Sequence, residues 1–118
     1  MSVILCAIDD LIFSIKISTA AKGLGADVFF ERSGEAVLPR IREKRPALVI
    51  LDLNSRRIES IGIVTAMKAD DELKAIRTLG YVSHVDADTI AAARAAGIDQ
   101  VLARSAFVAR LAEILTSG

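Results

Sequence analysis

Three carboxylates lie at the ends of apolar runs, where their side chains could take part in chemistry. Asp9 and Asp10 follow the apolar run VILCAI (3–8), and Asp52 lies near the end of a second run, ALVILDL (47–53). Adjacent carboxylates at the end of a buried strand repel each other and lose hydration, so they require a compensating charge. Carboxylate oxygens are ligands that Mg²⁺ prefers. The residues therefore indicate a cation site at which a carboxylate accepts a phosphoryl group held by the same ion.

The acidic pair also has a simpler interpretation. Asp9 can cap a helix that begins here, and Asp10 can lie solvated in its first turn, where the helix dipole favours a negative charge. The pair alone favours this interpretation. The presence of Asp52 after a second apolar run favours a shared site instead.

The elements that must position these residues follow from hydrophobic periodicity. Apolar runs of strand length alternate with segments of helical spacing, and the predicted strands are 3–8, 26–30, 47–53, 76–82 and 100–103. Runs that are apolar throughout are covered on both faces, and helical crossovers between them imply a parallel sheet. The expected fold class is α/β, a doubly wound five-stranded parallel sheet in three α/β/α layers.

Five helices are expected between and after the strands. The first ends at the glycines 23 and 25, the second opens at Ser33, and the third covers 58–69. The fourth is capped by Asp86 or Asp88 and closed by Gly97, with its alanines packed in the core. A single fifth helix starts after Arg104.

The strand order decides which residues meet. In open parallel sheets, sites assemble beyond the carboxyl ends of the strands where the order reverses. With the order 2-1-3-4-5, the first and third strands are neighbours, which brings the three carboxylates to one edge. Ser83 and His84 follow the fourth strand at the same edge, and Arg104 follows the fifth.

Composition limits the class of protein. The chain of 118 residues fits one domain, 1–118, and its 15 basic and 15 acidic residues cancel, which argues against a nucleic-acid partner. The single cysteine, Cys6, cannot form an internal disulfide. With neither a signal peptide nor an apolar run of roughly 18 residues, we expect a soluble protein of the reducing cytoplasm with no membrane partner.

Over essentially its whole length, the chain resembles the response-regulator receiver domains of two-component signalling. The resemblance is carried by the acidic pair, by Asp52 in LVILDLN, by Gly97 in AARAAGID and by the ending VLARSAF. It implies phosphorelay signal transduction in a flavodoxin-like fold rather than a classical enzyme, because a receiver at most catalyses its own phosphorylation and dephosphorylation. The implied partners are a sensor histidine kinase or phosphotransfer protein and a downstream protein target.

The resemblance also assigns roles to individual residues. Asp52 would be the phosphoacceptor, and Asp9, Asp10 and Asp52 would bind Mg²⁺ together with the backbone carbonyl of Asn54. Arg104 stands where the family usually has a lysine. Arginine keeps the charge but has a longer, planar head. Ser105 replaces the usual proline.

The family's other expected groups are displaced or missing. Val82 occupies the position of the usual Thr or Ser hydroxyl, with Ser83 one residue later, so Ser83 and Arg104 are the candidates for phosphate contact. Val101 replaces the switch aromatic of the fifth strand. His84, the only histidine, is expected at the surface rather than as a phosphocarrier.

The loop after Asp52 carries the charge pair Arg56 and Arg57 in place of the usual proline and glycine. Such charges normally face water. Alternatively, Arg56 or Arg57 folds over the carboxylates and replaces the metal. The chain would then be a pseudo-receiver, a phosphorylation-independent protein-interaction module.

The sequence allows three further alternatives. The fourth and fifth helices, with Arg94, could form a homodimer face. A Mg²⁺-dependent phosphohydrolase usually needs a second acid two residues after its nucleophile, where this chain has Asn54. A nucleotide-binding module is weaker still, because neither GxGxxG nor GxxxxGK[ST] occurs.

Overall fold

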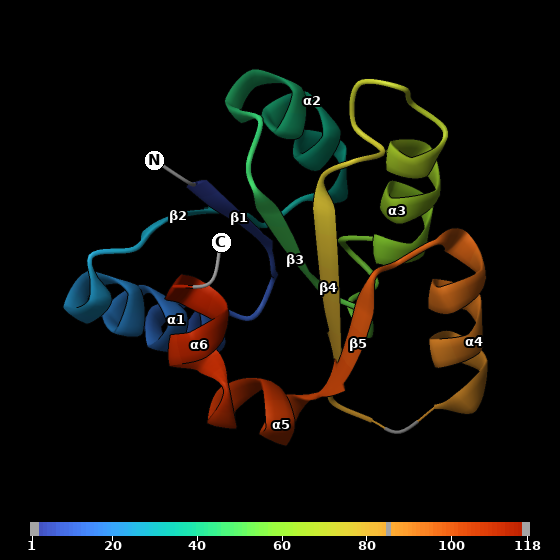
Figure 1. Ribbon diagram of the computed structural model, residues 1–118. Coiled ribbons are helices and arrows are strands. Elements are labelled where there is room, and N and C mark those ends of the chain that lie inside the picture. The colour runs from blue at the N-terminus through green and yellow to red at the C-terminus, as the bar shows by residue number, and fades with distance from the viewer. Residues whose placement is uncertain (1–2, 85, 117–118) are drawn as a thin grey trace.

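A computed structural model describes residues 3–84 and 86–116. One five-stranded parallel sheet in the order β2-β1-β3-β4-β5 forms its centre (Figure 1). The strands are β1 (Val3–Ala7), β2 (Asp27–Glu31), β3 (Leu48–Asp52), β4 (Arg77–Val82) and β5 (Gln100–Ala103). The predicted fold class and strand order are confirmed, and each strand boundary lies within one residue of its prediction.

Helices cover both faces of the sheet, as Figure 1 shows. They are α1 (Leu11–Leu24), α2 (Gly34–Lys44), α3 (Ser60–Lys68), α4 (Ala87–Ala96), α5 (Arg104–Ala109) and α6 (Leu111–Thr116). One face carries α1, α5 and α6, and the other carries α2, α3 and α4. Within the described residues, no helix is long and apolar enough to cross a membrane.

Side chains of β3 point alternately to the two faces of the sheet, and the hydrophobic core is divided accordingly into two clusters. Leu48 and Ile50 pack toward α1, α5 and α6, whereas Val49 and Leu51 pack toward α2, α3 and α4. Successive side chains of a strand point to opposite faces, so Asp52 continues the series of Leu48 and Ile50. The phosphoacceptor candidate therefore projects toward the α1–α5 side of the sheet.

Local capping chemistry fixes the helix ends as predicted in most places. Asp86 caps α4 by accepting from the backbone N–H groups of Asp88 and Thr89, and Gly97 ends that helix at a φ of 102°. Gly25 ends α1 at a φ of 68°. The acidic pair differs from the capping interpretation, since Asp10 and not Asp9 caps α1.

The third and fifth predicted helices have different limits. The third begins at Ser60, because Ile58 lies in the preceding loop, where it is fully buried. The segment after Arg104 forms two helices that meet at Arg110, not one. The break lets Phe107 pack among aromatic rings over the sheet while the apolar residues of α6 pack against α1.

The alanines of α4 are mostly solvent-exposed, contrary to the expectation that they form core. Ala93 is fully buried, whereas Ala87, Ala91, Ala92 and Ala95 face solvent. A helix on the outer layer buries only one stripe, and in α4 the positions of Ile90, Ala93 and Ala96 supply it.

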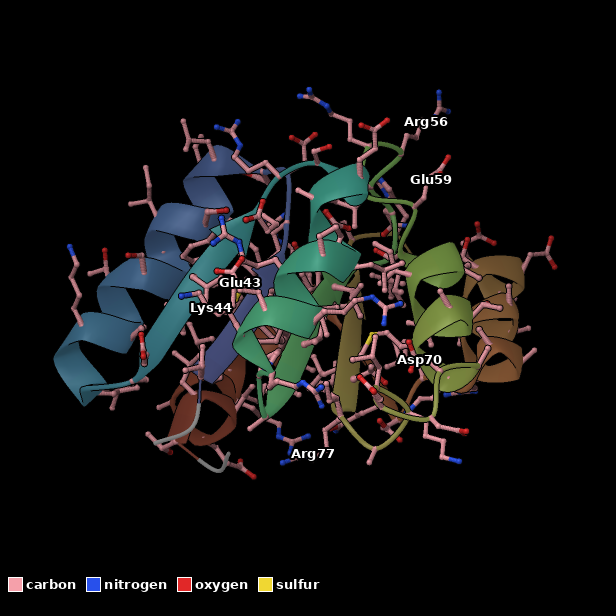
Figure 2. The ribbon with its side chains drawn as sticks, turned by 90° about the horizontal axis from the view of Figure 1, so that it is seen from above. Glu43, Lys44, Arg56, Glu59, Asp70 and Arg77 are labelled. Carbon is pink, nitrogen blue, oxygen red and sulfur yellow. The ribbon has the colours of Figure 1, made fainter. Side chains whose placement is uncertain are left out.

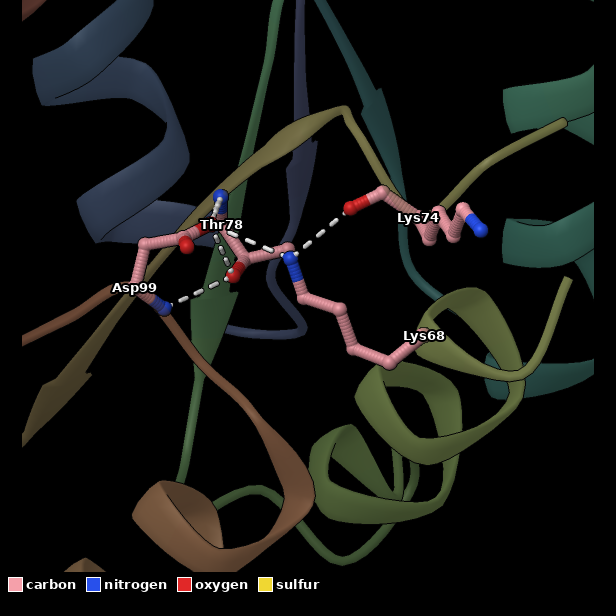
Figure 3. Close-up of polar contacts among 4 residues, drawn as sticks. All are labelled: Lys68, Lys74, Thr78 and Asp99. Carbon is pink, nitrogen blue, oxygen red and sulfur yellow. Dashed lines mark hydrogen bonds and ion pairs between the residues drawn. The ribbon is translucent and has the colours of Figure 1, made fainter. Parts of the chain in front are cut away.

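A polar network lies at the opposite end of the sheet from the acidic pair. Figure 2 shows Arg56 and Glu59 at one end and Asp70 and Arg77 toward the other. At the latter end, the Thr78 hydroxyl donates to Asp99 Oδ2 over 3.0 Å and accepts from the Asp99 backbone N–H (Figure 3). Lys68 Nζ donates to Asp99 and to the Lys74 carbonyl. The network ties α3 to the starts of β4 and β5.

Removing the Thr78 hydroxyl is expected to destabilise the fold. Thr78→Val leaves the Asp99 N–H without its partner at a position where Thr78 is 1% exposed, so the free energy of unfolding should fall by about 1–3 kcal/mol. Urea unfolding measures the change. Thr65→Val is the matched control, because the exposed Thr65 bonds only within α3 and should change stability by less than about 0.5 kcal/mol. Equal losses in both variants would contradict a stabilising role for the network.

Candidate functional site

The acidic residues meet at the carboxyl edge of the sheet. Asp9 and Asp10 follow β1, Asp52 ends β3, and these two strands pair directly with Ala7 opposite Leu51. Asp10 and Asp52 are close enough for the charge of Asp10 to act on the Asp52 carboxyl. The predicted placement of the three residues at one edge is thus present in the structure.

Asp10 has two partners at this edge. Its Oδ1 accepts from the backbone N–H of Phe13 at 3.0 Å, and its Oδ2 lies 3.4 Å from a guanidinium nitrogen of Arg104. The Arg104 guanidinium also lies 4.1 Å from the centre of the Phe13 ring, a cation–π arrangement. Arg104 is therefore held between a carboxylate and an aromatic face.

Asp9 pairs with an arginine of the β3–α3 loop. Arg57 Nη1 lies 3.5 Å from Asp9 Oδ1, with the Arg57 side chain 71% exposed. Figure 2 shows the neighbouring Arg56 directed away from the sheet. Of the two candidate arginines, Arg57 is the one that contacts an acidic residue, and whether it replaces a metal stays a prediction.

Asp52 occupies a partly buried position at the end of β3. Burial raises the pKa of its carboxyl above the usual range, and the charge of Asp10 acts in the same direction. The N–H of Asn54, which donates to Asp52 Oδ1 at 2.9 Å, opposes this rise, as do the Arg104 charge and the Tyr81 hydroxyl. Desolvation outweighs these groups.

The Asn54 side chain joins two loops of the site. Its Oδ1 accepts from the backbone N–H of Ser83 at 2.6 Å and of His84 at 3.3 Å, so the loop after β3 is bonded to the loop after β4. Ser83 and His84 are both exposed. The resemblance to receiver domains implies a role for the backbone carbonyl of Asn54 and none for its side chain. Its side-chain role depends on a loop contact that spacing does not reveal.

Val82 and Tyr81 take opposite faces of β4. Val82 packs in the core beside α2, α3 and α4, whereas Tyr81 packs on the face that carries α1 and α5. Tyr81 stacks on Phe107 with ring centroids 5.2 Å apart and lies 5.0 Å from Phe13. Burial raises the pKa of the Tyr81 hydroxyl far above its usual range, with a further rise from the Asp52 charge.

The oxygens available at this edge suit a hard cation, but the structure does not gather them into a metal site. Asp9, Asp10, Asp52 and the Asn54 carbonyl offer only oxygen ligands, the donor type of Mg²⁺. Among residues 3–84 and 86–116, no three His, Cys, Asp or Glu side chains stand close enough to hold a metal ion. A metal would have to compete with Arg57 for Asp9 and with Arg104 for Asp10.

Comparisons with solved structures place the fold among receiver domains. A response regulator from Hahella chejuensis superimposes with a TM-score of 0.88 at 17% identity, covering 98% of this chain and 93% of that one. The signal receiver domain of a DNA-binding response regulator from Colwellia psychrerythraea gives 0.84 at 15% identity over 100% of both chains. The Mn²⁺-bound response regulator Rcp1 gives 0.81 at 20% identity, covering 99% and 91%.

The fold of this chain is accordingly that of a response-regulator receiver domain. Comparison with protein-family models gives no match, and comparison with curated protein sequences gives none either. At identities of 15–20%, the three structures share an architecture with this chain, and the chemistry of the site depends on this chain's own residues.

Replacing the Asp52 carboxylate by an amide is expected to stabilise the protein at neutral pH. The folded pKa of Asp52 is raised, so above that pKa its charge costs folding free energy, and below the unfolded pKa the cost is absent. Asp52→Asn should therefore exceed the parent in stability at neutral pH, with the difference vanishing as pH falls through the folded and then the unfolded pKa. Urea unfolding with chelator present measures this.

Asp27→Asn is the control for this prediction, because Asp27 is an exposed carboxylate at the start of β2. It should leave stability unchanged within about 0.5 kcal/mol. A less stable Asp52→Asn at neutral pH would show that the carboxylate is better compensated than its burial indicates.

Proposed function

We propose that this chain is a signalling receiver that accepts a phosphoryl group on Asp52 from a phosphohistidine of a sensor kinase or phosphotransfer protein. The observation that carries the proposal is the position of Asp52. Its partly buried carboxylate ends the central strand β3, at the edge where the acidic pair and Arg104 also lie. Receiver architecture over nearly the whole chain supports it.

The proposed transfer uses Asp52 as nucleophile. An Asp52 carboxylate oxygen attacks phosphorus, the P–N bond breaks, and the neutral imidazole leaves after taking a proton from solvent. When bound, Mg²⁺ would offset the charge of the phosphoryl oxygens and of the carboxylates. To hold that metal, Asp9, Asp10, Asp52 and the Asn54 carbonyl would have to come closer together than they stand here, and the acidic pair would exchange its arginine partners for the ion.

Arg104 and the loop after β4 would act on the transferred group. The charge of Arg104 already acts on the Asp52 carboxyl, so the same side chain is positioned to attract the phosphoryl group. Ser83 follows β4 at this edge, and its exposed hydroxyl is the candidate for a second contact. Because Asn54 bonds the backbone of Ser83, a group added to Asp52 would act directly on this loop.

The output would be a protein contact. A downstream protein would recognise the surface around the β4–α4 loop, and the exposed face of α4 together with α5 offers a surface for a homodimer.

A second candidate function is the pseudo-receiver, favoured by one observation. Both members of the acidic pair already have an arginine partner, Arg57 on Asp9 and Arg104 on Asp10. A module that needs no phosphoryl group would use these pairs to neutralise the edge permanently. The two functions differ in whether Mg²⁺ and a phosphodonor change the protein.

Phosphorylation is expected with acetyl phosphate and Mg²⁺. Intact mass spectrometry should show the gain of one phosphoryl group in the parent and no gain in Asp52→Asn, because that amide cannot act as the acceptor. Asp10→Asn should reduce both metal binding and phosphorylation. An unchanged mass of the parent would overturn the receiver proposal and favour the pseudo-receiver.

Removal of the Arg57 charge is expected to strengthen Mg²⁺ binding. Exposed ion pairs contribute about 0–1 kcal/mol, so freeing Asp9 in Arg57→Ser should tighten binding by up to about fivefold. Amide shifts of residues 9, 10 and 52 during a Mg²⁺ titration measure it. Arg56→Ser, which removes the same charge one residue away, should have a smaller effect. No shift in parent or variants at millimolar metal would refute the metal site.

A further inference from the structure

Tyr81 carries an unusual buried hydroxyl. In the described part of the chain, Tyr81 Oη is the one buried side-chain nitrogen or oxygen without a hydrogen-bond partner. Tyr81 is 1% exposed, so water cannot easily satisfy the group. An unpaired buried hydroxyl costs about 1–3 kcal/mol, so its presence in a native structure calls for an explanation.

The sheet register places this tyrosine beside Asp52. Residues Asp52 and Tyr81 are direct partners in the parallel pairing of β3 and β4. Both side chains project toward the face that carries α1 and α5, since Asp52 follows Leu48 and Ile50 while Tyr81 follows Leu79. The hydroxyl meets no acceptor at hydrogen-bonding geometry, yet it is near enough to influence the Asp52 carboxyl as a donor.

Packing limits where the hydroxyl can go. The Tyr81 ring stacks on Phe107 at an interplanar angle of 26° and contacts Phe13 at 5.0 Å. Phe13 in turn carries the Arg104 guanidinium on its face. The ring is thus packed on the α1–α5 side, and Asp52, its partner in the sheet register, is the carboxyl on which its hydroxyl acts as a donor.

We propose that Tyr81 is a positioning residue for Asp52, with its hydroxyl donating to a carboxylate oxygen before transfer and to a phosphoryl oxygen afterwards. The second half of this proposal rests on the proposed receiver function. Tyr81 supplies a hydroxyl on the face of β4 that Asp52 shares, whereas Val82 packs on the opposite face and supplies none. A small movement of the ring would close the contact, because the hydroxyl lies beside the acceptor but is unpaired.

The contact would connect the acceptor to the helix after β5. Phe107 lies on α5 and stacks on Tyr81, so a shift of the tyrosine on phosphorylation would be transmitted to α5 through packed rings. This route does not need an aromatic residue on β5, where the chain has Val101. It runs from Asp52 through Tyr81 and Phe107 to α5.

The first test needs no phosphodonor. Tyr81 is the single tyrosine and the chain has no tryptophan, so near-UV absorption reports on this phenol above a weak phenylalanine background. A phenol that donates to a carboxylate absorbs at longer wavelength than an unbonded one. The band should shift to shorter wavelength in Asp52→Ala and stay in place in Asp9→Ala, a matched loss of charge at the same edge. An identical band in the parent and Asp52→Ala overturns the contact.

The second test measures the lifetime of the acyl phosphate. Tyr81→Phe removes the hydroxyl and keeps the ring, so after charging with acetyl phosphate and Mg²⁺ the half-life should fall at least about tenfold, the factor expected for one hydrogen bond to a charged oxygen. Phe107→Leu loosens the ring packing but keeps the hydroxyl, and it should shorten the half-life less while lowering stability more.

The outcomes separate this proposal from the receiver function. A parent that takes up no phosphoryl group refutes the receiver function, while the absorption test still decides whether Tyr81 contacts Asp52. A parent that is phosphorylated and a Tyr81→Phe variant with the same half-life and higher stability would show that the hydroxyl is an idle buried group, which overturns the positioning role.

Discussion

Charge compensation at the carboxyl edge is the constraint on which the rest of the site depends. Neighbouring strands bring Asp9, Asp10 and Asp52 to one place, and burial makes the charge on Asp52 unfavourable. The structure balances the edge with guanidinium groups from two distant segments, Arg57 after β3 and Arg104 after β5. Since both pairs are partly or largely exposed, each is weak enough to exchange for another cation.

The register of the sheet decides which side chains at this edge lie on each face of the sheet. Alternate residues of β3 and β4 face α1 and α5. Asp52, Tyr81 and the rings of Phe13 and Phe107 therefore lie on the same side of the sheet. The alternate residues of these strands face α2, α3 and α4, so Val82 lies on the face opposite to Asp52. A shift of β4 by a single residue would exchange them. The chemistry of the site therefore depends on the pairing of β3 with β4 as much as on residue identity.

Sequence reasoning captured the features that depend on local chemistry or strong periodicity. Strand limits and the caps Asp86 and Gly97 follow from neighbouring residues alone. The strand order does not, and it was expected from the usual order of doubly wound parallel sheets. The break at Arg110 was not predicted, because Phe107, Leu111 and Leu115 fit one helical face and only their different tertiary partners separate them. The sequence also offers two loop arginines, Arg56 and Arg57, as possible partners of the acidic pair. The conformation of the loop brings Arg57 to Asp9.

The unpredicted residues share a physical cause: each acts through a contact between segments about 29 residues or more apart, where periodicity carries no information. The Asn54 side chain accepts hydrogen bonds from the loop after β4, and Tyr81 lies beside Asp52 on the neighbouring strand. These bonds join the loop after β4 to the segment that follows Asp52, and the pairing of β3 with β4 places Tyr81 beside Asp52. A change at Asp52 would therefore reach the β4–α4 loop and α5 by separate routes, which allows the two surfaces to respond together without an aromatic residue on β5.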